Sequence, residues 1–398
     1  MRKPLGIILI IVGIMIILFV GYANSKVSKQ TRIFSSYSLL SSSWDSYKAQ
    51  FIQSDGRSID PSQQNITTSE AQGYALLRAV WIDDKPTFDK VYNFTINNMK
   101  RPKDNLFGWR YGKLASGTYG FLPGGGNNSA ADADSDIAYA LILASKRWND
   151  PIYKNHAMPI IKDMWKYETA TTSAGKRYII AGNWAQDQQK LIINVSYFAP
   201  YEWRTFAEVD HQHDWLSMIG PAYQLLNSAG STPLDKAKAV GIPPDWIAID
   251  RRTGALSAAN VSNLTTNYSF DAMRTPWRIA LDYQWYKDPQ ALNYLKKSYA
   301  LLGQQYDKSH TLASTYAHDG SVVTAAENPA MYATALGYFT VINKPVAAQI
   351  YQNKIIRLYS NDQNTFNKTI PYYEQNWLWF GAALYNNFLS NFSAKGRS

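Results

Sequence analysis

Apolar side chains recur at intervals of three and four positions along most of the chain. The spacing is clear in Ile137, Leu141 and Ala144, and it places side chains on one face of a helix. Proline stands in the first turn of several such segments, as at Pro151 and Pro289, where its missing N–H costs nothing. The pattern predicts about eleven helices, near residues 38–54, 69–83, 86–100, 134–148, 151–167, 214–228, 270–287, 289–305, 327–341, 345–359 and 372–390.

Two long connections between these helices are rich in Gly, Asn, Trp and Tyr. They cover residues 107–129 and 183–203, and long loops on a rigid scaffold usually carry function. We therefore predict one all-α domain, built as a ring of helix pairs with these loops forming a cleft at one end. The flat faces of the loop aromatics suit sugar rings. The alternative is that the Trp and Tyr side chains fill a large helical core.

The N-terminus carries a second pattern, a run of 18 uncharged residues from Leu5 to Tyr22. As a helix this run is about 27 Å long, close to the thickness of a bilayer core. We predict a single-pass membrane anchor, while Gly21-Tyr22-Ala23 leaves a cleaved signal peptide as the alternative. The predicted division is a cytoplasmic stub and anchor (1–23), a connector (24–36), a folded domain (37–390) and a tail (391–398).

Composition narrows the chemistry. The 398 residues include no cysteine, which excludes disulfides, thiolate metal sites, iron–sulfur clusters and cysteine nucleophiles. The net charge of +10 is compatible with a nucleic acid, an anionic membrane surface or an acidic glycan. Because the basic residues are scattered, without an arginine-rich segment, we expect no nucleic-acid partner.

Common catalytic signatures are missing from the chain. There is no HExxH, GxSxG or GxxxxGK[ST] motif and no GxGxxG after a strand. The one close histidine pair, His211 and His213, is compatible with a metal site, but a polar loop leading into a helix explains it as well. We predict no metal and no cofactor.

Carboxylates remain as candidate catalytic groups. Asp132, Asp134 and Asp136 alternate before an apolar helix; their spacing is not that of a calcium loop, because Gly and Glu are missing from the required positions. Capping of the helix N-terminus explains one of the three. Glu70 fits a capping box with Thr67 as N-cap. An ordinary ion pair with Arg274 accounts for Asp271.

Three segments together point to a family. Ala130 to Ala144, followed by Trp148, resembles the signature of glycoside hydrolase family 8, the bacterial endoglucanase and cellulase family. Ser69 to Tyr74 resembles the segment that holds the general acid of that family, and Phe270 to Arg278 resembles the one that holds its general base. Weaker likenesses lie at 106–109, 196–200, 372–373 and 379–381, so that the resemblance covers about residues 36–390. Two positions depart from the family: Ala131 replaces Ser or Thr, and Phe270 stands where Tyr often precedes the base.

The resemblance implies an (α/α)6 barrel and hydrolysis with inversion. By motif, Glu70 is the expected acid, Asp271 the base and Asp132 the carboxylate that holds the sugar at the cleavage point. An inverting pair stands roughly 6.5–9.5 Å apart to admit a water. The residues expected to bind substrate are Trp109, Tyr197, Trp203, Arg274 and Tyr373.

We therefore predict a membrane-anchored, extracellular and monomeric endo-acting hydrolase. Its expected substrate is a β-linked polysaccharide, either a β-1,4-glucan or a related exopolysaccharide. The alternative function is a non-catalytic protein that binds or assembles such a glycan on the same fold. The alternative location is secretion after signal cleavage.

Overall fold

The computed structural model describes residues 36–360 and 362–392. Within this part of the chain no helix combines the length and apolar character needed to cross a membrane. The predicted anchor, Leu5 to Tyr22, lies outside the described residues, as do residues 393–398 of the predicted tail. The predicted span and the predicted division of the chain therefore stay predictions.

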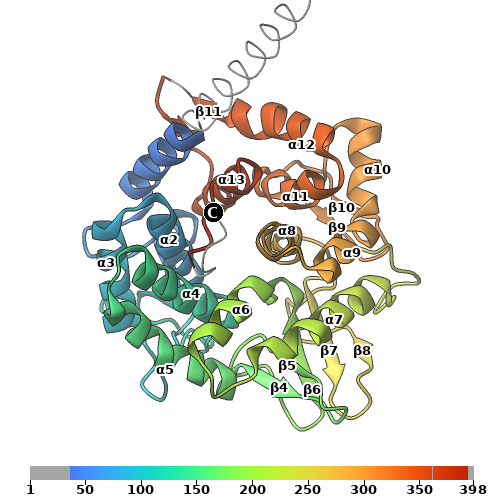
Figure 1. The fold of residues 1–398 in the computed structure, drawn as a ribbon, viewed down its shortest axis with the longest axis horizontal. Coiled ribbons are helices and arrows are strands. Elements are labelled where there is room, and N and C mark those ends of the chain that lie inside the picture. The colour runs from blue at the N-terminus through green and yellow to red at the C-terminus, as the bar shows by residue number, and fades with distance from the viewer. Residues whose placement is uncertain (1–35, 361, 393–398) are drawn as a thin grey trace, which may run out of the picture.

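Helices in the described region alternate along the chain between an inner and an outer ring (Figure 1). The fold is mostly helical, consistent with the predicted (α/α)6 barrel. The inner ring contains α2 (Ser69–Ile82), α4 (Ala131–Arg147), α6 (Pro200–Val209), α8 (Thr275–Tyr286), α11 (Pro329–Ile342) and α13 (Tyr372–Tyr385). The outer ring contains residues 36–51, α3 (Lys85–Phe94), α5 (Pro151–Tyr167), α7 (Ile219–Ser231), α9 (Pro289–Lys297), α10 (Ala300–Ser309) and α12 (Lys344–Ile350).

The sequences of the helices explain this division. Nearly every residue of α2 is buried, and α11 and α13 are likewise apolar around most of their circumference, as expected of helices enclosed on all sides. By contrast, α9 buries only Ala291, Tyr294 and Leu295, which form one face. Helices with one apolar face belong on the outside, where the opposite face meets water.

Glycines let the inner helices approach closely. A Cβ added to Gly337 of α11 would lie 2.4 Å from the backbone oxygen of Pro276 in α8, and one added to Gly381 of α13 would lie 2.4 Å from that of Ala333 in α11. Any larger residue would therefore force these helices apart. The ring closes where Tyr74 of α2 packs edge-on against Trp377 of α13, with ring centroids 5.6 Å apart.

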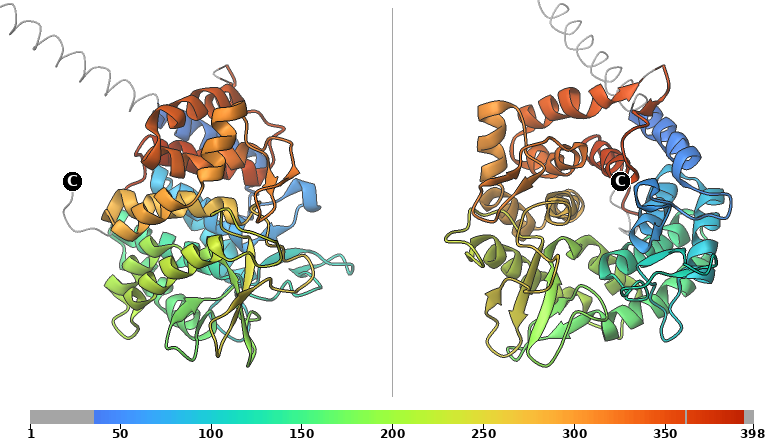
Figure 2. Two further views of the ribbon diagram at one scale, coloured as in Figure 1. Left: turned by 90° about the vertical axis from the view of Figure 1, so that its right-hand side faces the viewer. Right: turned by 180° about the vertical axis from the view of Figure 1, so that it is seen from behind.

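Short antiparallel strands occupy several connections between helices, including the two long ones at 107–129 and 183–203. The two three-stranded sheets lie at one end of the helical ring (Figure 2). One sheet has the order β1-β2-β3 (Thr67–Thr68, Arg110–Lys113, Tyr119–Phe121) and another β6-β7-β8 (Lys190–Asn194, Trp246–Asp250, Leu256–Ser257). In the second, Asn194 lies opposite Trp246 and Lys190 opposite Asp250. Two-stranded pairs are β4-β5 (Thr169–Thr171, Arg177–Ile179), β9-β10 (Thr315–Tyr316, Val322–Thr324) and β11-β12 (Tyr359–Ser360, Thr365–Phe366).

The helix predictions hold for most segments and fail at two. The helix predicted over 289–305 is divided into α9 and α10 at Tyr299, whose φ of 63° is left-handed and interrupts a helix. The sequence analysis missed α6, which begins at Pro200 inside the connection 183–203. Proline at its first position is a helix-start signal that the aromatic richness of this stretch obscured.

Candidate active site

Glu70 lies in the first turn of α2, directly after strand β1. The N-cap of α2 is Thr68, whose hydroxyl accepts the amide N–H of Ala71 at 3.0 Å, while Thr67 belongs to β1 and pairs with Tyr111. The capping box predicted with Thr67 as N-cap is therefore wrong by one residue. Glu70 does not stand at the third helical position, and its side chain, 22% exposed, reaches Arg274 instead.

The three alternating aspartates begin α4, and each has a different partner. The N-cap of α4 is Ala130, which makes no side-chain cap, so the N-capping explanation of the aspartates is wrong. Asp132 accepts a hydrogen bond from Arg274 Nη1 at 2.8 Å, and Asp134 accepts one from the amide of Phe107 at 2.9 Å. Asp136 accepts two from Arg278, both at 3.0 Å. Only Asp132 therefore takes part in the Glu70 cluster.

Asp271 precedes the short 3-10 helix Ala272–Arg274, which leads into α8. Its Oδ1 accepts a hydrogen bond from Arg274 Nη2 at 2.7 Å, and its Oδ2 accepts one from Trp246 Nε1 at 3.0 Å. The ion pair with Arg274 is present, as the sequence suggested. The side chain is 32% exposed, so a water molecule can reach this carboxylate.

Arg274 brings the three predicted carboxylates together. Nη1 donates to Glu70 Oε2 at 2.7 Å as well as to Asp132, while Nη2 binds Asp271. Nε donates to Ser196 Oγ at 3.1 Å and to the backbone oxygen of Asp271 at 3.2 Å. A planar guanidinium with every nitrogen engaged has a single orientation, so it fixes the carboxylates relative to one another.

The charge of this cluster is unbalanced, because one buried cation faces three acidic groups. Burial raises the pKa of Glu70 to about 7; Arg274 opposes this rise, and the nearby Asp132 and Asp271 add to it. Burial likewise raises the pKa of Asp132 against the effect of Arg274. Glu70 therefore holds a proton through much of the neutral range, as a general acid must.

A cleft of about 550 Å³ lies over the cluster. Trp109, Trp184, Tyr197 and Trp246 give it aromatic walls, with the rings of Trp184 and Trp246 6.4 Å apart. Among the described residues that line the cleft there is no lysine or arginine. The lining consists of Thr68, Ser69, Glu70, Trp109, Gly124, Asn128, Ser129, Ala130, Asp132, Ala181, Trp184, Tyr197, Trp246, Val261, Ser262, Asn263, Leu264 and Asp271.

Of the five predicted binding residues, two line the cleft, two lie next to it and one lies in the core. Trp109 and Tyr197 line the cleft. Arg274 is buried beneath it and binds the carboxylates, and Tyr373 donates its hydroxyl to the backbone oxygen of Phe270, beside Asp271. Trp203 is only 1% exposed and packs against Phe198 in the core. The structure thus corrects the prediction that Trp203 lines the cleft. The residue lies within α6, the helix that the sequence analysis missed, on a face turned into the core.

The sequence analysis also missed Trp184, Trp246 and Asp245. Trp246 begins β7 and binds Asp271 directly, and Asp245 precedes it. A signal was present, because Pro243 and Pro244 come just before this pair and the short apolar run Ile247 to Ile249 follows. Such a short apolar run is compatible with a helix as well as with a strand.

The histidine pair proves to be part of a polar turn. His213 Nδ1 lies 2.7 Å from Asp210 Oδ2, which also accepts a hydrogen bond from Trp215 Nε1 at 3.0 Å. Over the described residues, no group of three or more His, Cys, Asp or Glu side chains is arranged to hold a metal ion.

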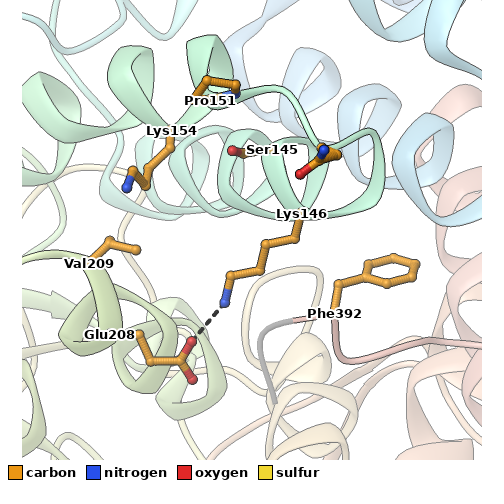
Figure 3. Close-up of a pocket in the computed structure, with 8 residues that line it drawn as sticks. Ser145, Lys146, Pro151, Lys154, Glu208, Val209 and Phe392 are labelled. Carbon is orange, nitrogen blue, oxygen red and sulfur yellow. Dashed lines mark hydrogen bonds and ion pairs between the residues drawn. The ribbon is translucent and has the colours of Figure 1, made fainter. Parts of the chain in front are cut away.

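A larger hollow, about 960 Å³, lies at the far ends of α4 and α6 (Figure 3). Lys146 of α4 and Glu208 of α6 form an ion pair of 2.8 Å within it. Lys146 is 14 residues beyond Asp132 on the same helix, which corresponds to about 20 Å. None of the predicted site residues lines this hollow, so the candidate active site is the cleft at the other end of the ring.

Comparison with known proteins gives both a family and a fold. The family model described as glycosyl hydrolases family 8 matches residues 22–378. An endoglucanase of Cellulomonas uda is 34% identical over 238 residues, which are 60% of this chain and 62% of the relative. The aligned part therefore spans less than two thirds of that relative.

Two solved structures show the same fold. An endo-1,4-D-glucanase from Vibrio fischeri ES114 superposes with a TM-score of 0.73 at 22% identity, covering 88% of this chain and 96% of the other. A β-1,3-1,4-glucanase from Paenibacillus sp. X4 superposes with a TM-score of 0.71 at 22% identity, covering 87% and 91%.

Proposed function

Because the chain belongs to glycosyl hydrolases family 8, we propose that it is an endo-acting hydrolase of a β-linked glucan that inverts the anomeric centre. One observation carries the proposal: Arg274 holds Glu70, Asp132 and Asp271 together under an aromatic cleft. Inverting hydrolysis needs a protonated carboxylic acid and an ionised carboxylate on opposite faces of the sugar. Glu70, with its raised pKa, fits the acid, and Asp271, which water can reach, fits the base.

Each carboxylate has a distinct task in this mechanism. Glu70 Oε2 is bound to Arg274, and its other oxygen, Oε1, carries the proton that passes to the leaving glycosidic oxygen. Asp271 takes a proton from a water molecule, whose oxygen bonds to the anomeric carbon as the glycosidic bond breaks. Asp132, held by the other side of the same arginine nitrogen, binds the sugar at the cleavage point.

The cleft favours a neutral glycan. The whole chain carries a net charge of +10, which left an acidic polymer open on sequence grounds. The cleft lining, however, offers carboxylates and aromatic rings without a lysine or arginine. The buried Arg274 is already bound to these three carboxylates, so in the part of the chain that the structure describes no cation faces the cleft to bind an anionic sugar. Stacking on Trp109 and Trp184 needs only the apolar face of a sugar ring. The similarity to an endoglucanase, an endo-1,4-D-glucanase and a β-1,3-1,4-glucanase supports a β-glucan with 1,4 or mixed 1,3-1,4 linkages.

Location forms a further part of the proposal. If Leu5 to Tyr22 anchors the chain, the hydrolase stays at the surface of the cell that makes it. Tethering raises the local concentration of enzyme near a polymer leaving the same membrane. We therefore favour trimming of a self-made exopolysaccharide outside the cell over digestion of a nutrient.

A panel assay with the full chain in detergent tests the proposal. The substrates are β-1,4-glucan, β-1,3-1,4-glucan, an acidic glycan and amino-sugar polymers. Release of reducing ends measures cleavage, and loss of viscosity measures cutting inside the polymer. NMR of the first product identifies its anomer. We expect cleavage of a β-glucan to an α-anomeric product and a loss of at least about 10³-fold in Asp271→Asn. Equal turnover by Asp271→Asn would disprove the assigned base, and binding without cleavage by the wild type would favour the non-catalytic alternative.

A further inference from the structure

Asp245 is a buried acid beside the candidate base that the mechanism above leaves without a role. It stands immediately before β7, is 3% exposed, and its own amide donates to the backbone oxygen of Asn267 at 2.6 Å. Burial of a carboxylate costs free energy unless several hydrogen bonds replace those it made to water. The identity of its donors shows what the residue holds.

All three donors to Asp245 come from the segment that carries Asp271. Oδ1 accepts the amide N–H of Ser269 at 3.1 Å and that of Ala272 at 2.7 Å, and Oδ2 accepts the Ser269 hydroxyl. Ser269 lies two residues before the base and Ala272 one residue after it. The segment is thus bound on both sides of Asp271, by its backbone.

The next residue in the chain binds the base itself. Trp246 Nε1 donates to Asp271 Oδ2 at 3.0 Å. Asp245 and Trp246 therefore hold two different parts of one segment, the backbone and the carboxylate. Burial raises the pKa of Asp245 to about 7, the charge of Asp271 adds to this rise, and the hydrogen bonds from Ser269 and Ala272 oppose it.

We propose that Asp245 is a positioning residue that fixes the backbone on both sides of the candidate base Asp271 and so sets the orientation of its carboxylate toward the attacking water. The inference rests on the proposed function, in which Asp271 is the base. A base must lie within hydrogen-bond reach of the water it activates, and a displacement of about 1 Å costs on the order of 100-fold in rate.

The other end of the same strand offers a matched control. Asp250 also accepts three hydrogen bonds through one oxygen, from the amides of Arg252 and Thr253 and from the Thr253 hydroxyl, at 3.0, 2.7 and 2.9 Å. It ends β7, however, about 17 Å along the strand from Asp245, and holds a surface turn. Asp250→Ala removes the same kind of contact without touching the base segment.

Kinetics of the full-length variants on the glucan that the wild type cleaves tests the inference. We expect Asp245→Ala to lower kcat about 100-fold with an unchanged KM, because the aromatic walls stay in place. Asp245→Asn keeps Oδ1 for both amides and can bind the Ser269 hydroxyl through its amide nitrogen, so we expect it to recover kcat to within about fivefold of the wild type. Asp250→Ala should match the wild type in kcat.

A β-linked oligosaccharyl fluoride separates base defects from acid defects, since fluoride departs without receiving a proton. Glu70→Gln should regain activity on it, whereas Asp245→Ala should lose the same factor as on the polysaccharide. Wild-type kcat in Asp245→Ala, or equal losses in Asp245→Ala and Asp250→Ala, would overturn the inference. If Asp245→Ala does not fold, Ser269→Ala replaces it, and we expect it to reduce kcat by at least about threefold. An unchanged kcat in Ser269→Ala would overturn the inference as well.

Hydrogen–deuterium exchange provides a readout that does not depend on activity. Loss of Asp245 should accelerate exchange of the Ser269 and Ala272 amides, and Asp250→Ala should leave them protected. If these amides exchange faster in Asp245→Ala but the wild type cleaves no glycan, the proposed function is refuted, while the role of Asp245 in fixing the backbone stands. Unchanged exchange in Asp245→Ala would refute the holding role, whatever the activity.

Discussion

Arg274, at the end of the 3-10 helix that leads into α8, and Arg278 of α8 are four residues apart, and they face two aspartates of α4 that are also four residues apart. Arg274 binds Asp132 and, together with it, Glu70 and Asp271. Arg278 binds Asp136 and Glu202 of α6, with the Tyr201 hydroxyl 3.0 Å from its Nη1. We call these the upper and lower ion clusters. The upper one opens onto the cleft, and the lower one is enclosed in the barrel.

The clusters differ in solvent access, because both set one arginine against more than one carboxylate. In the lower cluster every member is buried, so removal of its cation leaves two carboxylates without water or a counter-charge. In the upper cluster, Glu70 and Asp271 keep partial exposure, so a substrate and a water molecule can reach them. Enclosed ion pairs therefore serve the fold, while those open to a cleft can serve proton transfer.

The largest expected effect is loss of turnover from the upper cluster. Glu70→Gln keeps the shape of the side chain but removes the transferable proton, so we expect kcat on β-glucan to fall roughly 10³- to 10⁴-fold, or about 4–5 kcal/mol. The melting temperature should not decrease, because a neutral amide relieves repulsion with Asp132 and Asp271. Reducing-end assays and calorimetry measure both quantities; unchanged turnover would remove Glu70 as the acid.

In the lower cluster the expected loss is in stability. Arg278→Met leaves Asp136 and Glu202 buried without a cation, and we expect the free energy of unfolding to fall by about 3–4 kcal/mol in urea titrations. Arg147→Met is the control, since Arg147 pairs with the exposed Asp83 at the surface and should cost less than about 1 kcal/mol. Equal losses of unfolding free energy in Arg278→Met and Arg147→Met would contradict the view that the enclosed ion pairs contribute more to stability than exposed ones.

A smaller effect concerns pH. Since the pKa of Glu70 is raised to about 7, the acid is protonated below that pH, and kcat/KM should fall about tenfold for each pH unit above it. The folded protein also retains a proton that the unfolded chain releases, so this group's contribution to stability should decline as pH rises from about 4.5 to about 7. Urea titrations across this range should show a weaker decline in Glu70→Gln; an identical one would contradict the assignment.

The smallest predicted effect removes one hydroxyl from the lower cluster. Tyr201→Phe loses the contact with Arg278 while Asp136 and Glu202 still bind the cation, so we expect a loss of about 1 kcal/mol in unfolding free energy. Turnover should stay at the wild-type level. A drop in kcat larger than the loss of folded protein would show that the two clusters are coupled.

Sequence patterns located most of the helices, whereas the resemblance to a known family pointed to the four residues of the upper cluster, which lie together in the structure. Periodic apolar positions located most helices, because enclosed and one-sided helices both keep the 3.6-residue period. They could not locate the hairpins, whose strands of two to five residues are too short for a reliable alternation. The N-cap at Thr68 instead of Thr67 shows the same limit, since either hydroxyl fits the motif.

Tertiary packing decided the remaining differences. Trp203 and Trp109 both lie in connections rich in aromatics, yet one is in the core and the other at the cleft. Nothing in the local sequence distinguishes them, because the burial of Trp203 depends on how α6 packs against the rest of the barrel. Asp245 was missed for a related reason: its partners Ser269 and Ala272 are 24 and 27 residues away.

The bond between Arg274 and Glu70 spans 204 positions of the chain. No nascent or truncated polypeptide that lacks either end of that interval can assemble the reactive centre. The proposed hydrolysis therefore requires a chain in which the segments of Glu70 and Arg274 are both folded into the barrel. Under that proposal, turnover reports the assembly of distant segments and not the presence of any single motif.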